Sequence, residues 1–223
     1  FHEELNKRWE LYGRQLVALD GPGNHKGSSQ QDCKYPYYQG RCSLTPPDPA
    51  CNRAEAAEIA AMNPAYVIAP VANGAFFNEL GKRGIIVSGG AHRPAAYLSD
   101  VAGYNYDLLT DGTRAASMVA EYYCKRLYGK PVQWAGPSVT NPDRLASTPP
   151  PLRKLAVLYP ATDGDPTYKL SADLLIELVS GGMCGAPSDG VRGYPYQSDI
   201  NTATQQALTT AAAIKNDGAT TVV

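Results

Sequence analysis

The chain has 223 residues, of which 43% are hydrophobic and 18% are charged, and its formal net charge is -1. This composition is that of a globular protein and excludes a disordered or collagen-like chain. The 20 Lys and Arg residues are scattered and balanced by 21 Asp and Glu residues, so nucleic acid is not an expected partner. No apolar run approaches the roughly 20 residues needed to cross a bilayer, and the first residues lack the pattern of a signal peptide.

The first half of the chain predicts helices and strands in alternation. Residues 1–12 place apolar side chains at helical spacing, and an apolar run at 14–20 ends in turn residues, as a buried strand does. After a loop, the sequence predicts a helix, a strand, a helix and a strand in turn, at 53–63, 65–71, 72–84 and 85–91. A further loop leads to a helix at 111–129, whose inward-facing side chains we expect to be Met118, Tyr122 and Cys124. This order predicts a doubly wound, mostly parallel sheet.

The composition changes near residue 131. The stretch 131–151 is rich in proline and has no sustained period, so we expect it to connect two lobes. Beyond it the sequence predicts a strand, a helix, a strand, a helix and the first residues of another strand, at 153–160, 168–182, 191–197, 201–218 and 219–223. The expected organisation is a first ligand-binding lobe at 1–130 and the start of a second lobe at 152–223, with both ends of the chain cut.

Three of the five cysteines, Cys33, Cys42 and Cys51, are spaced nine residues apart in one polar, turn-rich loop. Zinc sites use close cysteine pairs or histidines at ligand spacing, and this loop has neither, so we expect no metal. We expect two of the three to form a disulfide, with Cys33–Cys42 as the first choice, and Cys124 to be a buried free thiol. A disulfide in a surface loop favours an oxidising compartment.

Catalytic motifs find little support in the sequence. In the glycine-rich stretch 21–29, Lys26 precedes Gly27, which is the wrong order for a phosphate loop, and no dinucleotide fingerprint follows a predicted strand. The chain has three histidines and no nucleophile elbow, which disfavours serine hydrolysis. Asp163 and Asp165 stand in a D-G-D-P stretch that is typical of a turn, with an acid–base or metal pair as the alternative. We therefore expect no catalytic residues and no cofactor.

Two strand-to-helix turns carry the predicted binding residues. The stretches APVANGAF and VSGGAHRP fall at the carboxyl ends of consecutive strands, where α/β sheets bind ligands. Small residues let a ligand approach the backbone, and the unpaired N–H groups of a helix N-terminus favour a carboxylate. The residues that fit this role are Asn73, Gly74, Ser88, Gly90 and Ala91. The alternative is that these small residues only form tight turns.

The order of the elements and several local stretches resemble the type I periplasmic-binding family, particularly its branched-chain amino acid (Leu/Ile/Val) binding branch. The likeness rests on GRQLVALD, YVIAPVANG, VSGGAHRP and KLAVLYP, and on a closing stretch in which the matching residues are Asp199, Ile214, Lys215, Gly218 and Val222. His92 stands where the family has a threonine, and Asn73 stands where its amino-acid binders have a serine. These departures leave the identity of the ligand open.

The resemblance implies two α/β lobes, each a doubly wound and mostly parallel sheet, which close by hinge motion over a small polar molecule such as an amino acid. It adds His92 and Tyr168 to the expected ligand contacts, with Tyr168 covering the ligand from the second lobe. It also implies a monomeric, non-catalytic protein of the periplasm or cell surface, secreted or lipid-anchored, that serves the membrane permease of an ABC importer. The alternatives are a sensory receptor of the same fold, an α/β enzyme using Asp165 or His92, and a ligand-free structural relative.

Overall fold

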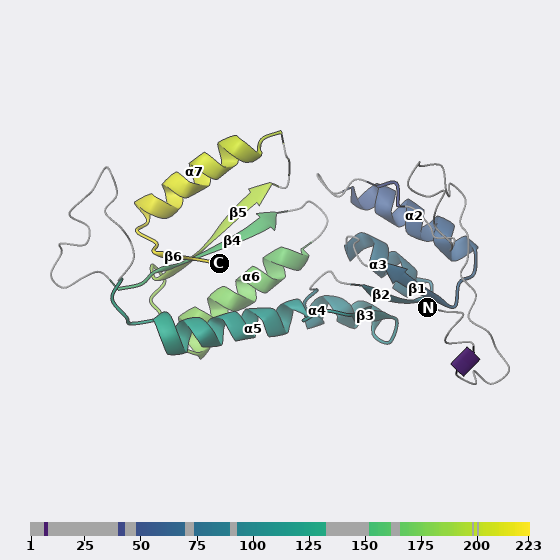
Figure 1. Cartoon of the computed structure of the whole chain (residues 1–223), viewed down its shortest axis with the longest axis horizontal. Coiled ribbons are helices and arrows are strands. Elements are labelled where there is room, and N and C mark those ends of the chain that lie inside the picture. Colours follow the sequence, from purple (N-terminus) through teal and green to yellow (C-terminus); the bar gives the residue numbers. More distant parts are fainter. Residues whose placement is uncertain are drawn as a thin grey trace.

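Two three-stranded parallel sheets organise the part of the chain that the structure describes (Figure 1). The computed structural model describes residues 7–8, 40–42, 48–69, 74–89, 93–132, 152–161, 166–197, 199 and 201–223. Helices lie beside both sheets, so the predicted α/β class with parallel strands is confirmed. Of the helix expected at 1–12, only Lys7 and Arg8 are described, and they are helical, while the strand expected at 14–20 lies outside the described residues.

The first sheet has the strand order β1-β2-β3 and follows the predicted alternation. Its strands are β1 (Tyr66–Ala69), β2 (Ile86–Gly89) and β3 (Asn105–Asp107). Helices α2 (Pro49–Ala61) and α3 (Gly74–Lys82) pack together and cover one face. The buried side chains at this interface are Ala56, Ile59, Phe76, Phe77, Leu80, Ile85 and Val87.

Local signals determine where α2 and α3 begin and end. The Asp48 side chain accepts a hydrogen bond from Cys51 N at 2.9 Å, and Pro49 occupies the first turn, so α2 begins earlier than its alanine-rich stretch predicts. Gly84 follows α3 with a φ of 75°, a conformation that favours glycine and ends the helix where the sequence predicts.

The segment after β2 contains more regular structure than the predicted loop. A short helix α4 (Ala95–Leu98), a 3-10 turn (Ser99–Val101) and strand β3 occupy it. Each of these elements is three or four residues long, which is too short for a period to show in the sequence.

The second sheet has the order β5-β4-β6, with the first strand in chain order at its centre. The strands are β4 (Leu155–Ala161), β5 (Val191–Gln197) and β6 (Thr221–Val222), and the helices between them are α6 (Thr167–Glu177) and α7 (Ala203–Asn216). All five elements predicted beyond residue 152 are therefore present. Strands β4 and β5 are in register along their whole length, from Leu155 opposite Val191 to Ala161 opposite Gln197.

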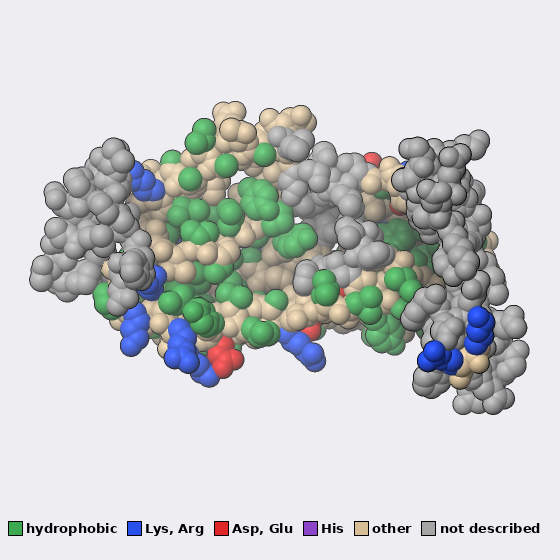
Figure 2. Space-filling model, viewed as in Figure 1, with side chains coloured by type: hydrophobic (Ala, Val, Ile, Leu, Met, Phe, Trp, Pro, Cys, Tyr) green, Lys and Arg blue, Asp and Glu red, His purple; other side chains and the backbone are tan. Residues whose placement is uncertain are grey.

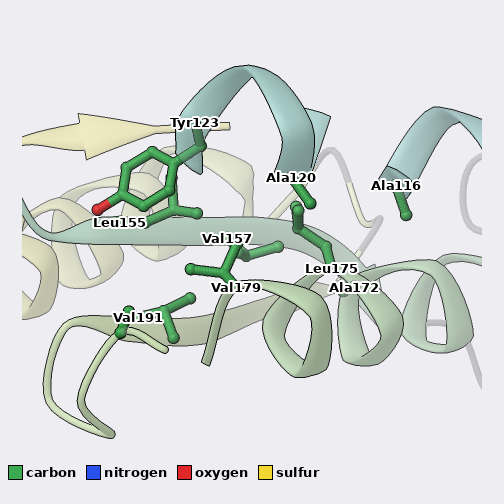
Figure 3. Close-up of a cluster of buried hydrophobic side chains, with 10 residues drawn as sticks. Ala116, Ala120, Tyr123, Leu155, Val157, Ala172, Leu175, Val179 and Val191 are labelled. Carbon is green, nitrogen blue, oxygen red and sulfur yellow. The ribbon is translucent and has the colours of Figure 1, made fainter. Parts of the chain in front are cut away.

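Helix α5 (Gly112–Tyr122), extended by a π-helical turn at Tyr123–Leu127, packs against α6 and the second sheet. The close-up in Figure 3 shows their shared core. The buried residues of this core are Ala116, Ala120, Tyr123, Leu155, Val157, Ala172, Leu175, Val179, Ala186 and Val191. The phenol of Tyr123 also donates a hydrogen bond to Arg153 O at 3.1 Å, which ties the end of the helix to the start of β4.

The inward-facing side of α5 differs in part from the prediction, although Cys124 packs against the core as predicted. Met118 and Tyr122 are 64% and 62% exposed, whereas Ala116, Ala120 and Tyr123 are buried. These three residues follow the i, i+4, i+7 spacing of one helix face. Small alanine side chains let the backbones of α5 and α6 approach closely, so the contact face of α5 is the one with less hydrophobic bulk.

Helix α5 falls within the first lobe expected from the sequence, at 1–130, yet its buried face contacts elements of the second sheet. The described ends of the proline-rich stretch also lie together, since Pro131 and Leu152 form an isolated antiparallel bridge and Arg153 N donates to Lys130 O at 3.3 Å. The described elements before α5 thus contribute to the core of the first sheet, and α5 contributes to the core of the second sheet. The interior of that stretch, 133–151, lies outside the described residues.

Two disulfides are present, and each corrects a prediction. Cys42 is bonded to Cys51, with Cα atoms 5.6 Å apart, so the expected Cys33–Cys42 bond is wrong, although two of the three loop cysteines do pair. The start of α2 at Pro49 places Cys51 in the first helical turn, where it meets Cys42. Cys33 lies outside the described residues.

The predicted free thiol at Cys124 is also wrong, because Cys124 is bonded to Cys184 with Cα atoms 5.4 Å apart. The contact between α5 and α6 brings together these two cysteines, which are 60 residues apart in the chain. Two disulfides are typical of a protein from an oxidising, extracytoplasmic environment.

We predict that the two disulfides contribute unequally to stability. By the loop-entropy relation, a 60-residue separation corresponds to about 4 kcal/mol of unfolding free energy, and a separation of 9 to about 2.5 kcal/mol. The variant Cys124→Ser/Cys184→Ser should therefore unfold at a lower urea concentration than Cys42→Ser/Cys51→Ser, as measured by circular dichroism. If Cys42→Ser/Cys51→Ser unfolded at the lower urea concentration instead, the Cys124–Cys184 bond would not be the one that stabilises the fold more.

We predict that α5 tolerates substitution on its bulky face and not on its small one. Ala120 is fully buried, so Ala120→Leu should lower the unfolding free energy by about 1 to 3 kcal/mol through overpacking. Met118→Ala, on the exposed face of the same helix, should change it by less than about 0.5 kcal/mol. Urea denaturation of both variants measures the unfolding free energy. A larger decrease for Met118→Ala than for Ala120→Leu would mean that Met118 faces inward, as the sequence predicts.

Candidate functional site

The candidate site lies at the carboxyl ends of the strands of the first sheet. Because β1, β2 and β3 are parallel, their last residues Ala69, Gly89 and Asp107 share one edge. Of the binding residues predicted in this part of the chain, Gly74 and Ser88 are described, and they belong to elements that meet at this edge. The others lie outside the described residues, namely Asn73, Gly90, Ala91 and His92.

Close packing requires glycine at position 89 and favours it at position 74. A Cβ atom on Gly89 would lie 2.1 Å from Ala69 O and 2.5 Å from Phe77 Cζ. A Cβ atom on Gly74, the first residue of α3, would lie 2.4 Å from the Tyr97 hydroxyl. The small residues at the two turns therefore allow contacts within the protein, which is the alternative that the sequence left open. Close backbone approach by a ligand remains a prediction for the neighbouring residues.

Ser88 lies inside β2, and its side chain has a partner in the protein. It is only 2% exposed, and its hydroxyl is hydrogen-bonded to the phenol of Tyr66 on the neighbouring strand β1. Ser88 therefore supports the edge from within the sheet. A direct bond from this hydroxyl to a ligand would have to compete with Tyr66.

A buried charged cluster that the sequence did not predict is centred on Arg93, the first described residue after β2. The Arg93 side chain is fully buried, its guanidinium carbon is 3.8 Å from the centre of the Phe77 ring, and its Nε is 3.7 Å from Asp107 Oδ2. The backbone N–H of Arg93 donates to the same carboxylate oxygen at 2.9 Å. The charge of the Arg93 guanidinium is therefore offset by the Asp107 carboxylate and the face of the Phe77 ring. The carboxylate is also stabilised by a backbone N–H, and all of these groups are shielded from water.

Sequence signals for this cluster exist but are weak. Arg93 is the only charged residue in the described segment that links β2 to α4, and Asp107 ends a three-residue strand that is too short to recognise. Only the pairing of β2 with β3 shows that the two residues meet.

The same cluster is joined to the start of α5. Gly112 N donates to Arg93 O at 3.2 Å, and Ala95 N donates to Thr113 Oγ1 at 2.8 Å. The N-terminus of α5 itself is capped by Asp111, whose side chain accepts from Arg114 N at 2.9 Å. The segment that follows the turn is therefore held between β3 and α5.

The second sheet presents a comparable edge. Successive connections from β4 and β5 lead to opposite sides of β4, which makes the carboxyl end of β4 a switch point of the kind where α/β sheets bind ligands. Tyr168 lies in the first turn of α6, directly after this end, and is 46% exposed. The arrowheads of β4 and β5 point toward the first sheet in Figure 1. Asp165, the acid of the enzyme alternative, lies outside the described residues.

Two cavities open near α7. One, of about 670 Å³, lies at the carboxyl end of β5 and is lined by Gln197, Asp199, Thr202 and Gln206 among others. The other, of about 560 Å³, lies between α7 and the sheet and is mostly apolar, as the hydrophobic side chains beside α7 in Figure 2 show. Both volumes are in the range of small-molecule sites.

Charges at the opposite, amino-terminal edge of the second sheet are paired with one another. Lys154 Nζ is 2.8 Å from Asp189 and holds the pKa of that carboxyl below its usual value. Asp217 accepts hydrogen bonds from Arg192 and Tyr194, each at 2.7 Å. Burial, followed by the bond to Asp217, raises the pKa of Tyr194 to about 12. Mutual pairing makes this edge less suited to a ligand than the carboxyl edges.

Within the described ranges, no three His, Cys, Asp or Glu side chains gather where a metal ion would be held, and no helix has the length and apolarity to span a membrane. The described parts of the two carboxyl edges offer backbone and side-chain hydrogen bonds, an aromatic ring and buried charge. Comparison of the chain with family models, curated proteins and solved structures found no significant match.

We predict strong coupling between Arg93 and Asp107. Arg93→Met should lower the unfolding free energy by about 3 to 5 kcal/mol, because it leaves a buried carboxylate without its opposite charge. Asp107→Asn in the same chain should recover at least about 1 kcal/mol relative to the sum of the single changes.

The measurement is a double-mutant cycle by urea denaturation. The exposed pair of Arg83 and Glu79 is the control, and Arg83→Met should cost less than about 1 kcal/mol. Additive losses for Arg93 and Asp107 would mean that the two charges are screened from each other.

Proposed function

We propose that this chain is part of an extracytoplasmic solute-binding protein of the type I periplasmic-binding fold, which captures a small polar molecule such as an amino acid for an ABC importer. The observation that carries the proposal is the pair of parallel sheets with their carboxyl edges turned toward each other, each bearing predicted ligand contacts. Binding between two such edges is the capture mode implied by the resemblance in sequence.

The compartment is consistent with this role. The disulfides Cys42–Cys51 and Cys124–Cys184 favour an oxidising environment, where solute-binding proteins of the periplasm or cell surface act. A membrane permease is the proposed recipient of the ligand, and the proposed protein catalyses no reaction.

The proposed capture begins at the turns of the first sheet. The backbone N–H groups of residues 90–92 and the side chain of Asn73 are the proposed donors to a polar or anionic group of the ligand. Arg93 follows these proposed donors directly in the chain; its side chain is buried, and its backbone N–H donates to Asp107.

The proposed capture ends when the second sheet contributes Tyr168. This side chain is half exposed at the start of α6, so ligand contact would bury aromatic surface that is otherwise open to water. Burial of the ring only in the closed state supplies the differential affinity that a hinge mechanism requires.

Calorimetric titration tests the proposal, with leucine, isoleucine and valine first and then the remaining amino acids. Native mass spectrometry of the freshly purified chain should identify any molecule that co-purifies. We expect one saturable site and a smaller radius of gyration in solution scattering once it is filled. Saturable binding without compaction would refute hinge capture, and substrate turnover would favour the enzyme alternative.

We predict that Tyr168→Ala weakens binding of the identified ligand by about tenfold or more, since aromatic contacts at the centre of an interface commonly contribute over 1 kcal/mol. The matched control is Tyr122→Ala, which removes an exposed tyrosine from the outer face of α5. Calorimetry on both variants is the measurement. Equal affinities for the two variants would place the site away from α6.

A further inference from the structure

Helix α7 covers the second face of the second sheet incompletely. Side chains alternate between the two faces of a strand, and Leu155, Val157 and Val191 point into the core shared with α5 and α6 (Figure 3). Leu158 of β4 and Tyr196 of β5 therefore lie on the opposite face, which is the face that α7 covers in Figure 1. None of the 14 residues of α7 is buried. The helix thus lies over this face without packing closely against it.

The incomplete contact leaves the apolar cavity of about 560 Å³ between α7 and the sheet. Helical spacing places several apolar side chains of α7 on the side that faces this cavity. The apolar part of its lining consists of Leu158, Tyr196, Ala203, Ala207, Ala211 and Ile214. Protein interiors are normally close-packed, so a space of this size beneath a helix can hold a small molecule.

The apolar cavity adjoins the polar cavity of about 670 Å³ at the carboxyl end of β5. Gln197, Asp199, Gln206 and Thr210 line both cavities, so the two spaces meet at these side chains. Most of the remaining lining of the polar cavity consists of hydroxyl and amide side chains in the first two turns of α7. A ligand that occupies both spaces therefore has an apolar body and a polar end.

One carboxylate determines the charge that the polar end should carry. Among the described residues that line the two cavities, only Asp199 is charged. Its Oδ1 accepts hydrogen bonds from Asn201 N at 2.9 Å and from Asn201 Nδ2 at 3.0 Å, which hold the side chain in place. No described Lys or Arg forms an ion pair with Asp199. An ammonium group would complement this carboxylate, whereas an anionic group would be repelled by it.

We propose that the two cavities beside α7 bind an amphiphilic amine, with its alkyl or aromatic part between Ala207 and Leu158 and its ammonium group beside Asp199. The apolar part of this site lies on the face of the sheet away from α6, and no residue of the first sheet contributes to it. The proposal therefore stands apart from the capture of a solute between the two sheets.

Calorimetric titration of the chain with octylammonium, octanol and octanoate tests the chemistry, each probe being kept below the concentration at which it aggregates. Octylammonium should bind saturably, octanol about fivefold more weakly, and octanoate more weakly still because Asp199 repels it. Butylammonium keeps the charge and shortens the apolar part, so it should bind at least about tenfold more weakly than octylammonium. No saturable binding, equal binding of the three octyl probes, or equal binding of the two ammonium probes would overturn the proposal.

Two substitutions test the location of the site. Asp199→Asn keeps the acceptor for Asn201 and removes the charge, so it should weaken octylammonium binding about fivefold and leave octanol binding unchanged. Ala207→Leu should weaken the binding of both probes about tenfold or more, because the larger side chain occupies the apolar cavity. The matched control is Ala212→Leu, since Ala212 is exposed on the side of α7 that faces away from the cavity.

Circular dichroism in urea shows whether each variant is folded. If Ala207→Leu does not fold, hydrogen exchange of the unaltered chain decides, because octylammonium should protect amides of α7 and leave those of α6 unchanged. Protection of α6 without α7, or equal affinities for folded Ala207→Leu and Ala212→Leu, would place the amine elsewhere and overturn the proposal.

Discussion

The close contact between α5 and α6 is the constraint on which the arrangement of the described chain depends. Alanine at 116 and 120 allows the two helices to approach, whereas the Asp111 cap sets where α5 begins. Its C-terminal end is held by the second core, and Gly112 N in its first turn donates to Arg93 O, next to the first sheet. Arg93 and Ala95 then find hydrogen-bond partners in the first turn of α5.

Buried charge and small residues work together at that edge. Arg93 and Asp107 compensate each other only because β2 and β3 are neighbours, and Gly89 leaves room for the Phe77 ring on which the guanidinium lies. A larger residue at position 89 would therefore displace the Phe77 ring from the Arg93 guanidinium and would also disturb strand β2. The stability of the first sheet thus depends on the same few contacts that hold Arg93 in place.

Elements with a long or strong pattern were predictable from the sequence, and those defined by tertiary contact were not. Strand β5 has the bounds that the sequence predicts, and α3 ends at its glycine. The face of α5 was misassigned because hydrophobic bulk indicates burial only when the neighbouring helix leaves space for it. Disulfide Cys124–Cys184 and the Arg93–Asp107 pair were missed because their partners are distant in sequence. Of the predicted ligand contacts, Gly74 and Tyr168 lie in the first turns of helices at the two carboxyl edges. The Ser88 hydroxyl is instead hydrogen-bonded to Tyr66.

The bridge between Pro131 and Leu152 has a consequence for how this protein can vary. Because the two residues hold each other, the number of residues between them can change without moving α5 or β4. Loop-closure entropy grows only slowly with length, by about 0.6 kcal/mol for each doubling. Relatives of different length at this point, or an inserted peptide tag, are therefore compatible with the same pair of sheets.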